Sequence, residues 1–187
     1  MNNDHDTEND CNYRGRFAPS PTGPLHFGSL VTAVGSYLEA KTNNGEWLIR
    51  VEDLDPPREI AGASDLTLET LECFGFEWDG DILYQSQRHD LYEEALAKLI
   101  ENDLAYPCGC TRKEIMRTAK RSSQGPIYPG TCRNGLPDGK VGRSYRLKTP
   151  DADFSFDDTL QGEIRQNLRL DMGDFILRRS DGLWAYN

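Results

Sequence analysis

The residues best suited to chemistry lie in the segment RFAPSPTGPLHFGSL, from Arg16 to Leu30. Its three prolines stiffen the chain, because each one fixes φ and removes a backbone donor. His26 stands directly before a run with helical periodicity, so a helix is expected to begin there with unpaired N–H groups and a dipole that favours an anion. His26 could then donate to a phosphate oxygen, and Gly28 would let a nucleotide approach the backbone. The alternative is a histidine that only caps or packs against a turn.

A second polar group, Glu52 and Asp53, follows the stretch EWLIRV, which is typical of a strand from about Trp47 to Val51. The order strand, loop, helix, strand is the opening of a parallel α/β sheet. Open sheets of this kind bind ligands at the carboxyl ends of their strands. We therefore expect Arg16, His26 and Glu52 at one sheet edge. The alternatives are a solvated pair of acids at Glu52–Asp53 and a surface ion pair at Arg16.

Three of the five cysteines, Cys108, Cys110 and Cys132, share one segment. Three thiolates suit zinc, and a structural zinc site has a fourth ligand. The three histidines of the chain all lie outside this segment, and the C-x-C spacing is tighter than in common zinc fingers. The alternative is a set of three reduced cysteines in a loop-rich region. We expect Cys73 to be a core residue and Cys11 to lie in a tail.

The charge is unevenly distributed. The chain carries a net −10, yet residues 106–148 hold ten Lys/Arg and only two Asp/Glu. Such a concentration suits a polyanion, although it could equally be a solvated basic face. The odd cysteine number favours a reducing cytoplasm, and we expect no membrane segment and no secretory signal in the acidic N-terminus.

The pattern along the chain predicts helices near residues 64–74 and 91–100, antiparallel strands within 143–164, and a hairpin over 174–187. The sequence ends at Asn187 inside an apparent strand, so we expect an incomplete sheet. The expected parts are a disordered acidic tail (1–12), the first half of a catalytic domain (13–105), an inserted subdomain (106–175) and a return to the sheet (176–187).

Three stretches carry a family resemblance. RFAPSPTGPLHFGSL is similar to the first motif, the HIGH motif, of class I aminoacyl-tRNA synthetases in its glutamyl and glutaminyl version. LIRVEDLDPPR resembles the second landmark of the glutamate branch. Together with WDGDILYQSQRHDLY they resemble the short members that lack an anticodon-binding domain and attach glutamate to the queuosine base of tRNA(Asp). The likeness runs from Tyr13 to Asn187.

The resemblance implies an α/β fold with a Rossmann-like parallel sheet and an inserted zinc- and acceptor-binding subdomain. It implies a cytoplasmic, monomeric enzyme that uses L-glutamate, ATP with Mg²⁺, and tRNA(Asp) bearing queuosine, with one structural zinc per chain. Arg16 would pair with the glutamate side chain, Glu52 with its α-ammonium, and Tyr186 would donate its hydroxyl, unless it is a core tyrosine. The resemblance implies that the substrate-binding residues are Arg16, Phe17, Ala18, Pro19, Ser20, Glu52 and Tyr186. It implies that His26, Gly28 and Ser29 bind ATP and that His26 and Gly28 are catalytic. The implied zinc ligands are Cys108, Cys110, Tyr128 and Cys132.

The sequence departs from the family pattern in one respect. The lysine-bearing loop (KMSKS-like) and the later arginine that complete such sites do not occur within these 187 residues. We therefore expect the 187 residues alone not to activate glutamate. The competing hypotheses are a fragment of an ordinary glutamyl-tRNA synthetase, a non-enzymatic zinc-stabilised RNA-binding module, and another nucleotidyltransferase with an H-x-G loop.

Overall fold

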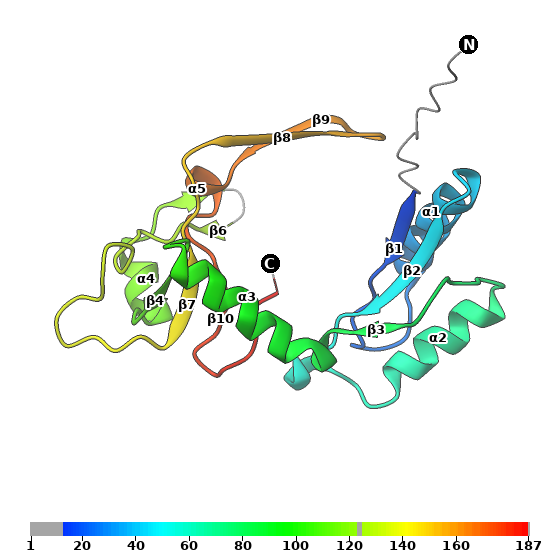
Figure 1. Cartoon of the computed structure of the whole chain (residues 1–187), viewed down its shortest axis with the longest axis horizontal. Coiled ribbons are helices and arrows are strands. Elements are labelled where there is room, and N and C mark those ends of the chain that lie inside the picture. The colour runs from blue at the N-terminus through cyan, green and yellow to red at the C-terminus, as the bar shows by residue number, and fades with distance from the viewer. Residues whose placement is uncertain (1–12, 123–124, 187) are drawn as a thin grey trace, which may run out of the picture. The chain divides into compact units, whose positions relative to one another are not determined.

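The computed structural model describes residues 13–122 and 125–186, so the expected acidic tail and Cys11 lie outside the described residues. The chain divides into two compact units, one ending at Arg88 and the other beginning at His89 (Figure 1). This division precedes the boundary expected at 105/106 because the helix α3 (His89–Glu101) packs on residues that follow it, including Trp184. The expected four-part organisation stays a prediction.

The first unit is built on a three-stranded parallel sheet in the order β1–β2–β3. Its strands are β1 (Arg14–Phe17), β2 (Glu46–Val51) and β3 (Leu83–Tyr84). Its helices are α1 (Phe27–Thr42) and α2 (Ala63–Cys73), with 3₁₀ turns at Pro56–Arg58 and Gln85–Arg88. Strands, helices and the parallel pairing of β1 with β2 confirm the expected α/β opening. The two-residue strand β3 was not expected.

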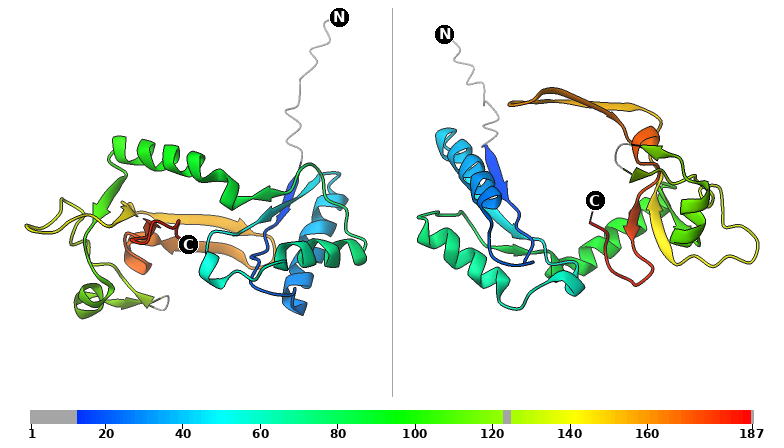
Figure 2. Two further views of the ribbon diagram at one scale, coloured as in Figure 1. Left: turned by 90° about the horizontal axis from the view of Figure 1, so that it is seen from below. Right: turned by 180° about the vertical axis from the view of Figure 1, so that it is seen from behind.

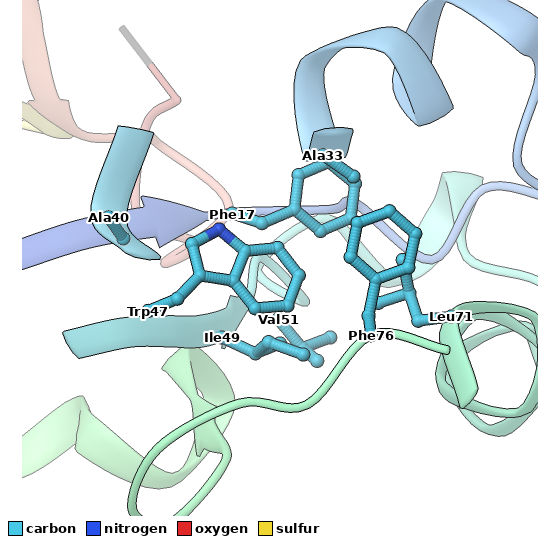
Figure 3. Packing of buried hydrophobic residues seen from close by; sticks show 8 residues of the cluster. All are labelled: Phe17, Ala33, Ala40, Trp47, Ile49, Val51, Leu71 and Phe76. Carbon is cyan, nitrogen blue, oxygen red and sulfur yellow. The ribbon is translucent and has the colours of Figure 1, made fainter. Parts of the chain in front are cut away.

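The core of this unit forms around Trp47, which is completely buried. Its ring stacks on Phe76 at 5.4 Å between centroids (Figure 3). Tyr37 meets the Trp47 ring edge-on at 5.2 Å. The indole N–H donates to Ser36 Oγ at 2.9 Å, which satisfies the one polar group that burial would leave unpaired. Because β2 alternates, Ile49 and Val51 enter the same core while intervening residues face outward.

The apolar pattern from Gly28 onward predicts a buried helix face of Leu30, Val34, Tyr37 and Leu38, but the buried face of α1 is a different one. Ala33 and Ala40 are fully buried against the sheet, whereas Val34 and Leu38 are 43% and 55% exposed. The small alanine side chains let the helix approach the strands closely, so the larger residues are turned away. The prediction for Cys73 is also wrong, because this side chain is exposed at the end of α2.

The second unit contains a three-stranded antiparallel sheet in the order β10–β7–β4. Two hairpins, β5–β6 and β8–β9, form separate two-stranded sheets, and β8–β9 is a long narrow ribbon (Figure 2). The strands are β4 (Ala105–Cys108), β5 (Arg121–Ser122), β6 (Gly125–Pro126), β7 (Ser144–Leu147), β8 (Asp153–Asp158), β9 (Gly162–Asn167) and β10 (Ile176–Arg178). The remaining helices are α4 (Arg112–Thr118) and α5 (Leu168–Asp171).

The expected hairpin near the end of the chain is confirmed. Strand β10 turns back so that Arg178 bridges Trp184, and the Arg179 N–H donates to Leu183 O at 2.8 Å. Antiparallel strands were expected in RSYRLKTP and FSFDDTLQGEI; the first stretch contains β7, which pairs with β4 and β10, and the second forms most of the β8–β9 hairpin. Among the helices of the described residues, none is long and apolar enough to span a membrane.

Candidate functional site

The loop after β1 is fixed to the end of β2. The Glu52 N–H donates to Pro19 O at 2.9 Å, and the Ile60 N–H donates to Pro21 O at the same distance. Because β1 and β2 run in parallel, with Arg16 opposite Leu48, their carboxyl ends lie at one edge. The proline-rich loop is therefore a fixed segment of backbone beside Glu52.

Arg16 and Phe17 point to opposite sides of β1. The Phe17 ring is buried against Trp47, so only its main chain could face a ligand, and Pro19 is buried as well. Arg16 is exposed, and its guanidinium has no hydrogen-bond or ion-pair partner within residues 13–122 and 125–186. The surface ion pair considered for Arg16 is thus not formed. A two-pronged cation is left available to an anionic ligand.

His26 is the N-cap of α1. Its Nδ1 accepts from the Ser29 N–H at 3.1 Å, and Nε2 lies 3.2 Å from Ser29 Oγ. A Cβ at Gly28 would lie 3.1 Å from His26 Cε1, so glycine keeps room for the imidazole. The capping alternative therefore describes what His26 does here. The cap still leaves other first-turn N–H groups for an anion, and no acidic side chain in the first turn neutralises the positive end of the helix dipole.

Glu52 and Asp53 are not a solvated pair of acids. Glu52 accepts from Arg50 Nη2 at 2.6 Å, and only 9% of its side chain is exposed. Asp53 accepts from both the N–H and the Oγ of Ser86, at 2.9 and 2.6 Å. Asp53 thus ties the end of β2 to the segment after β3, while Glu52 is held at the loop edge. This structural role of Asp53 was not expected.

Tyr186 lies at the end of the C-terminal hairpin in the second unit. Its side chain is 69% exposed, so the alternative of a core tyrosine is wrong. The hairpin is anchored within its unit, because Trp184 Nε1 donates to His89 Nδ1 at 3.1 Å and its ring meets Tyr92. The structure brings Arg16, Ser20, His26 and Glu52 into the same unit, and the role of Tyr186 stays a prediction.

The second unit gathers the three cysteines into one cluster. The sulfurs of Cys108, Cys110 and Cys132 all lie within 4.8 Å of one another. The hydroxyl of Tyr128 lies 3.3 Å from Cys108 Sγ and 3.6 Å from Cys110 Sγ, and the Cys110 and Cys132 sulfurs are 3.6 Å apart. A tetrahedral zinc site with Zn–S of ~2.3 Å and Zn–O of ~2.0 Å requires ligand separations of about 3.5–3.8 Å. The four side chains therefore fit one zinc ion.

Neighbouring groups hold Tyr128 in this position. The Cys132 N–H donates to the Tyr128 oxygen at 3.0 Å, which orients a lone pair of that oxygen. Gly173 has φ of +71°, and a Cβ there would lie 2.9 Å from the Tyr128 backbone, so the two segments meet only because residue 173 is glycine. Burial and the adjoining thiols raise the pKa of Tyr128, so the phenol is neutral until a metal ion supplies positive charge.

The thiols of the cluster are not equivalent. Burial alone would raise the pKa of Cys108, but hydrogen bonds from Tyr128, the Cys110 backbone and Arg146 outweigh burial, so that this pKa is lowered. Burial raises the pKa of Cys110. Cys108 is therefore better prepared than Cys110 to be a thiolate ligand.

Asp174 is a buried hub that sequence reasoning missed. One of its oxygens accepts from the Tyr106 hydroxyl at 2.6 Å. The other accepts from the Thr149 N–H and Oγ1, at 3.0 and 2.8 Å, and from Arg133. Burial would raise the pKa of Asp174, but these donors lower it. The hub joins the loop that carries Cys132 to strand β4 and to the segment that follows β7. No local sequence pattern predicts the Asp174 hub, because the residues that bind Asp174 are far apart in the sequence.

The fold and the site define the class of protein. Residues 12–187 match the model of the class I tRNA synthetases (E and Q), catalytic domain, and the chain belongs to this family. The crystal structure of the glutamate-tRNA synthetase from Elizabethkingia anophelis is similar, with a TM-score of 0.78 and 29% identity, covering 94% of this chain and 40% of that one.

Two curated relatives are more similar in sequence than this solved structure. The chain is 63% identical over 174 residues to the glutamyl-Q tRNA(Asp) synthetase of Chromobacterium violaceum, covering 93% of this chain and 58% of that protein. It is 58% identical over 176 residues to the glutamyl-Q tRNA(Asp) synthetase of Dechloromonas aromatica, with the same coverage. The chain thus spans about three fifths of the length of these relatives.

Proposed function

We propose that the full-length protein activates L-glutamate with ATP and transfers the glutamyl group to the queuosine base of tRNA(Asp). The observation that carries this proposal is the 63% identity over 174 residues to a glutamyl-Q tRNA(Asp) synthetase. The exposed guanidinium of Arg16, which has no partner among the described residues, and the first-turn N–H groups of α1 that His26 does not cap suit an acidic amino acid and a triphosphate.

The reaction depends on positioning of the substrates rather than on covalent catalysis by side chains. The glutamate α-carboxylate attacks the α-phosphorus of ATP, pyrophosphate leaves, and glutamyl-adenylate forms. A hydroxyl of the queuosine ring then attacks the activated carbonyl, and AMP leaves. In this scheme Arg16 binds the glutamate side chain, Glu52 binds its α-ammonium, and His26 with Gly28 and Ser29 lies at the phosphates. Mg²⁺ would neutralise phosphate charge as the reaction proceeds.

The test uses two assays on the full-length protein. Glutamate-dependent ATP–pyrophosphate exchange measures activation, and transfer of labelled glutamate measures the acceptor. We expect ATP–pyrophosphate exchange that does not require tRNA(Glu). We expect labelled glutamate on tRNA(Asp) that carries queuosine and none on tRNA(Asp) that lacks it. Label on tRNA(Glu) instead would support an ordinary glutamyl-tRNA synthetase and overturn the proposal. The 187-residue chain is expected to give no exchange.

We also propose one structural zinc per chain at Cys108, Cys110, Tyr128 and Cys132. Changing Cys132 to Ser removes a buried sulfur ligand, and a site with only three strong ligands left should lose its ion during purification. We expect zinc to fall from about one per chain to nearly none, measured by elemental analysis of gently purified protein. The control is Cys73→Ser, because Cys73 is an exposed cysteine outside the cluster and its loss should leave zinc content unchanged.

The basic segment is proposed to contact tRNA through α4. Arg112, Lys113 and Arg117 are all exposed on this helix. Each phosphate contact contributes about one to the slope of log affinity against log salt, so Gln at all three positions should reduce the slope by about three and weaken binding. The affinity and its salt dependence are measured by filter binding of tRNA(Asp) to the full-length protein at several salt concentrations. Arg165→Gln with Arg169→Gln is the control, and an unchanged slope in the α4 variant would leave these residues as a solvated face.

A further inference from the structure

Arg146 is a buried arginine without a carboxylate partner. The residue is 6% exposed on strand β7, and among residues 13–122 and 125–186 no Asp or Glu forms an ion pair with it. Asp174, which lies next to it, uses its carboxylate for other donors and offers Arg146 only its backbone oxygen, at 2.6 Å. A buried cation is costly unless an anion compensates it.

The Arg146 side chain also contacts the cluster formed by Cys108, Cys110, Tyr128 and Cys132. Its Nε donates to Cys108 Sγ at 3.3 Å, and its guanidinium carbon lies 3.8 Å from the centre of the Tyr128 ring. The plane of one side chain therefore touches two of the four proposed zinc ligands. A planar, permanently charged group with several donors suits this double contact better than an ammonium.

We propose that Arg146 is a positioning residue of the metal site, which orients Cys108 and Tyr128 and offsets the negative charge of the loaded cluster. Three thiolates and a phenolate outweigh the charge of a divalent ion, so the loaded site carries an excess of negative charge inside the protein. Arg146 supplies the compensating cation at the one place where it meets both a sulfur and the phenol ring. This inference rests on the zinc site proposed above.

Metal binding to the 187-residue chain tests the assignment. Zinc affinity is measured by competition with a chromophoric chelator, and the cobalt-substituted protein is examined for its thiolate-to-cobalt charge-transfer and d–d absorption. We expect Arg146→Met to bind zinc about 10–100-fold more weakly and to shift the charge-transfer band, because the donor to Cys108 is gone. Arg146→Lys keeps the charge and should lose less affinity. Arg143→Met, an exposed arginine three residues away, is the matched control and should behave as the unmodified chain.

The outcomes separate the possible failures. If the unmodified chain binds no zinc, the metal site itself is wrong and the role of Arg146 falls with it. If that chain binds zinc and Arg146→Met matches it in affinity and cobalt spectrum, the role of Arg146 alone is wrong. A drop in thermal stability of the metal-free variant with an unshifted cobalt spectrum would indicate a purely structural residue and also overturn the proposal. If circular dichroism shows that Arg146→Met is unfolded, the Arg146→Lys variant is used instead. Its cobalt spectrum must then differ from that of the unmodified chain, and an unchanged cobalt spectrum would overturn the proposal.

Discussion

Replacing Arg16 by Ala in the full-length protein is expected to lower glutamate-dependent ATP–pyrophosphate exchange at least 100-fold. The guanidinium is exposed at the carboxyl end of β1 and has no partner among the described residues, so the substitution removes nothing that the fold uses. Each hydrogen bond between charged groups contributes about 1.5–3 kcal/mol, and a two-pronged contact with a carboxylate contributes two of them. The loss should appear mainly as a higher KM for glutamate, with the KM for ATP nearly unchanged.

The matched control lies two residues earlier on the same strand. Arg14 is also exposed, and its Nε pairs with Glu46 at 2.8 Å. Arg14→Ala removes a surface ion pair of about 0–1 kcal/mol and should leave exchange unchanged. Equal activity of Arg16→Ala and Arg14→Ala would exclude Arg16 as the group that binds glutamate, whatever the origin of the remaining activity.

The second large effect is expected at Asp174, where Asn should destabilise the second unit by about 3–5 kcal/mol. The carboxylate is buried and accepts bonds from Tyr106, Thr149 and Arg133. Removing its charge leaves the Arg133 cation without its partner and forces an amide N–H₂ group against donors. Urea unfolding, followed through the second unit, measures the change. Asp157→Asn on the exposed strand β8 is the control and should stay within about 0.5 kcal/mol.

Asp174 also predicts a pH dependence with a defined sign. Its pKa in the folded chain lies below the ordinary value, because the surrounding donors outweigh burial. The stabilisation is therefore complete above the unfolded-state pKa of about 3.9 and is lost as the pH falls through the lower folded-state value. Stability of the unmodified chain should decline as pH decreases below about 5, and the decline should be shallower in Asp174→Asn. Parallel curves for the two proteins would show that other carboxylates dominate.

The β1–α1–β2 opening could be predicted because its signals are local. Alternation places Trp47, Ile49 and Val51 on one face, and the proline-rich loop and His26 mark the start of α1. The convergence of the three cysteines was also predictable, since their types and spacing suit a common ligand. The fourth member, Tyr128, came from the family resemblance, because no spacing rule singles out a tyrosine.

Other features could not be predicted because the residues that determine them give a weak local pattern or lie far apart in the sequence. Helix α4 has only seven residues and no apolar stripe, although Thr111 and Glu114 form a capping box that could have indicated it. The Asp174 hub depends on residues from four separate segments. The exposed side of α1 was misassigned because close packing of Ala33 and Ala40 overrides the preference of larger apolar residues for burial.

The pairing of β1 with β2 sets Arg16 opposite Leu48 and Phe17 opposite Ile49. A slip of β1 by a single position would push the guanidinium into the space around Trp47 and send the phenyl ring into water. Burying that charge costs several kcal/mol, and exposing the ring costs about 1.5–3 kcal/mol more. Misaligned molecules should therefore unfold rather than accumulate as folded protein, so the same alternation that builds the interior also keeps Arg16 on the exposed face of β1.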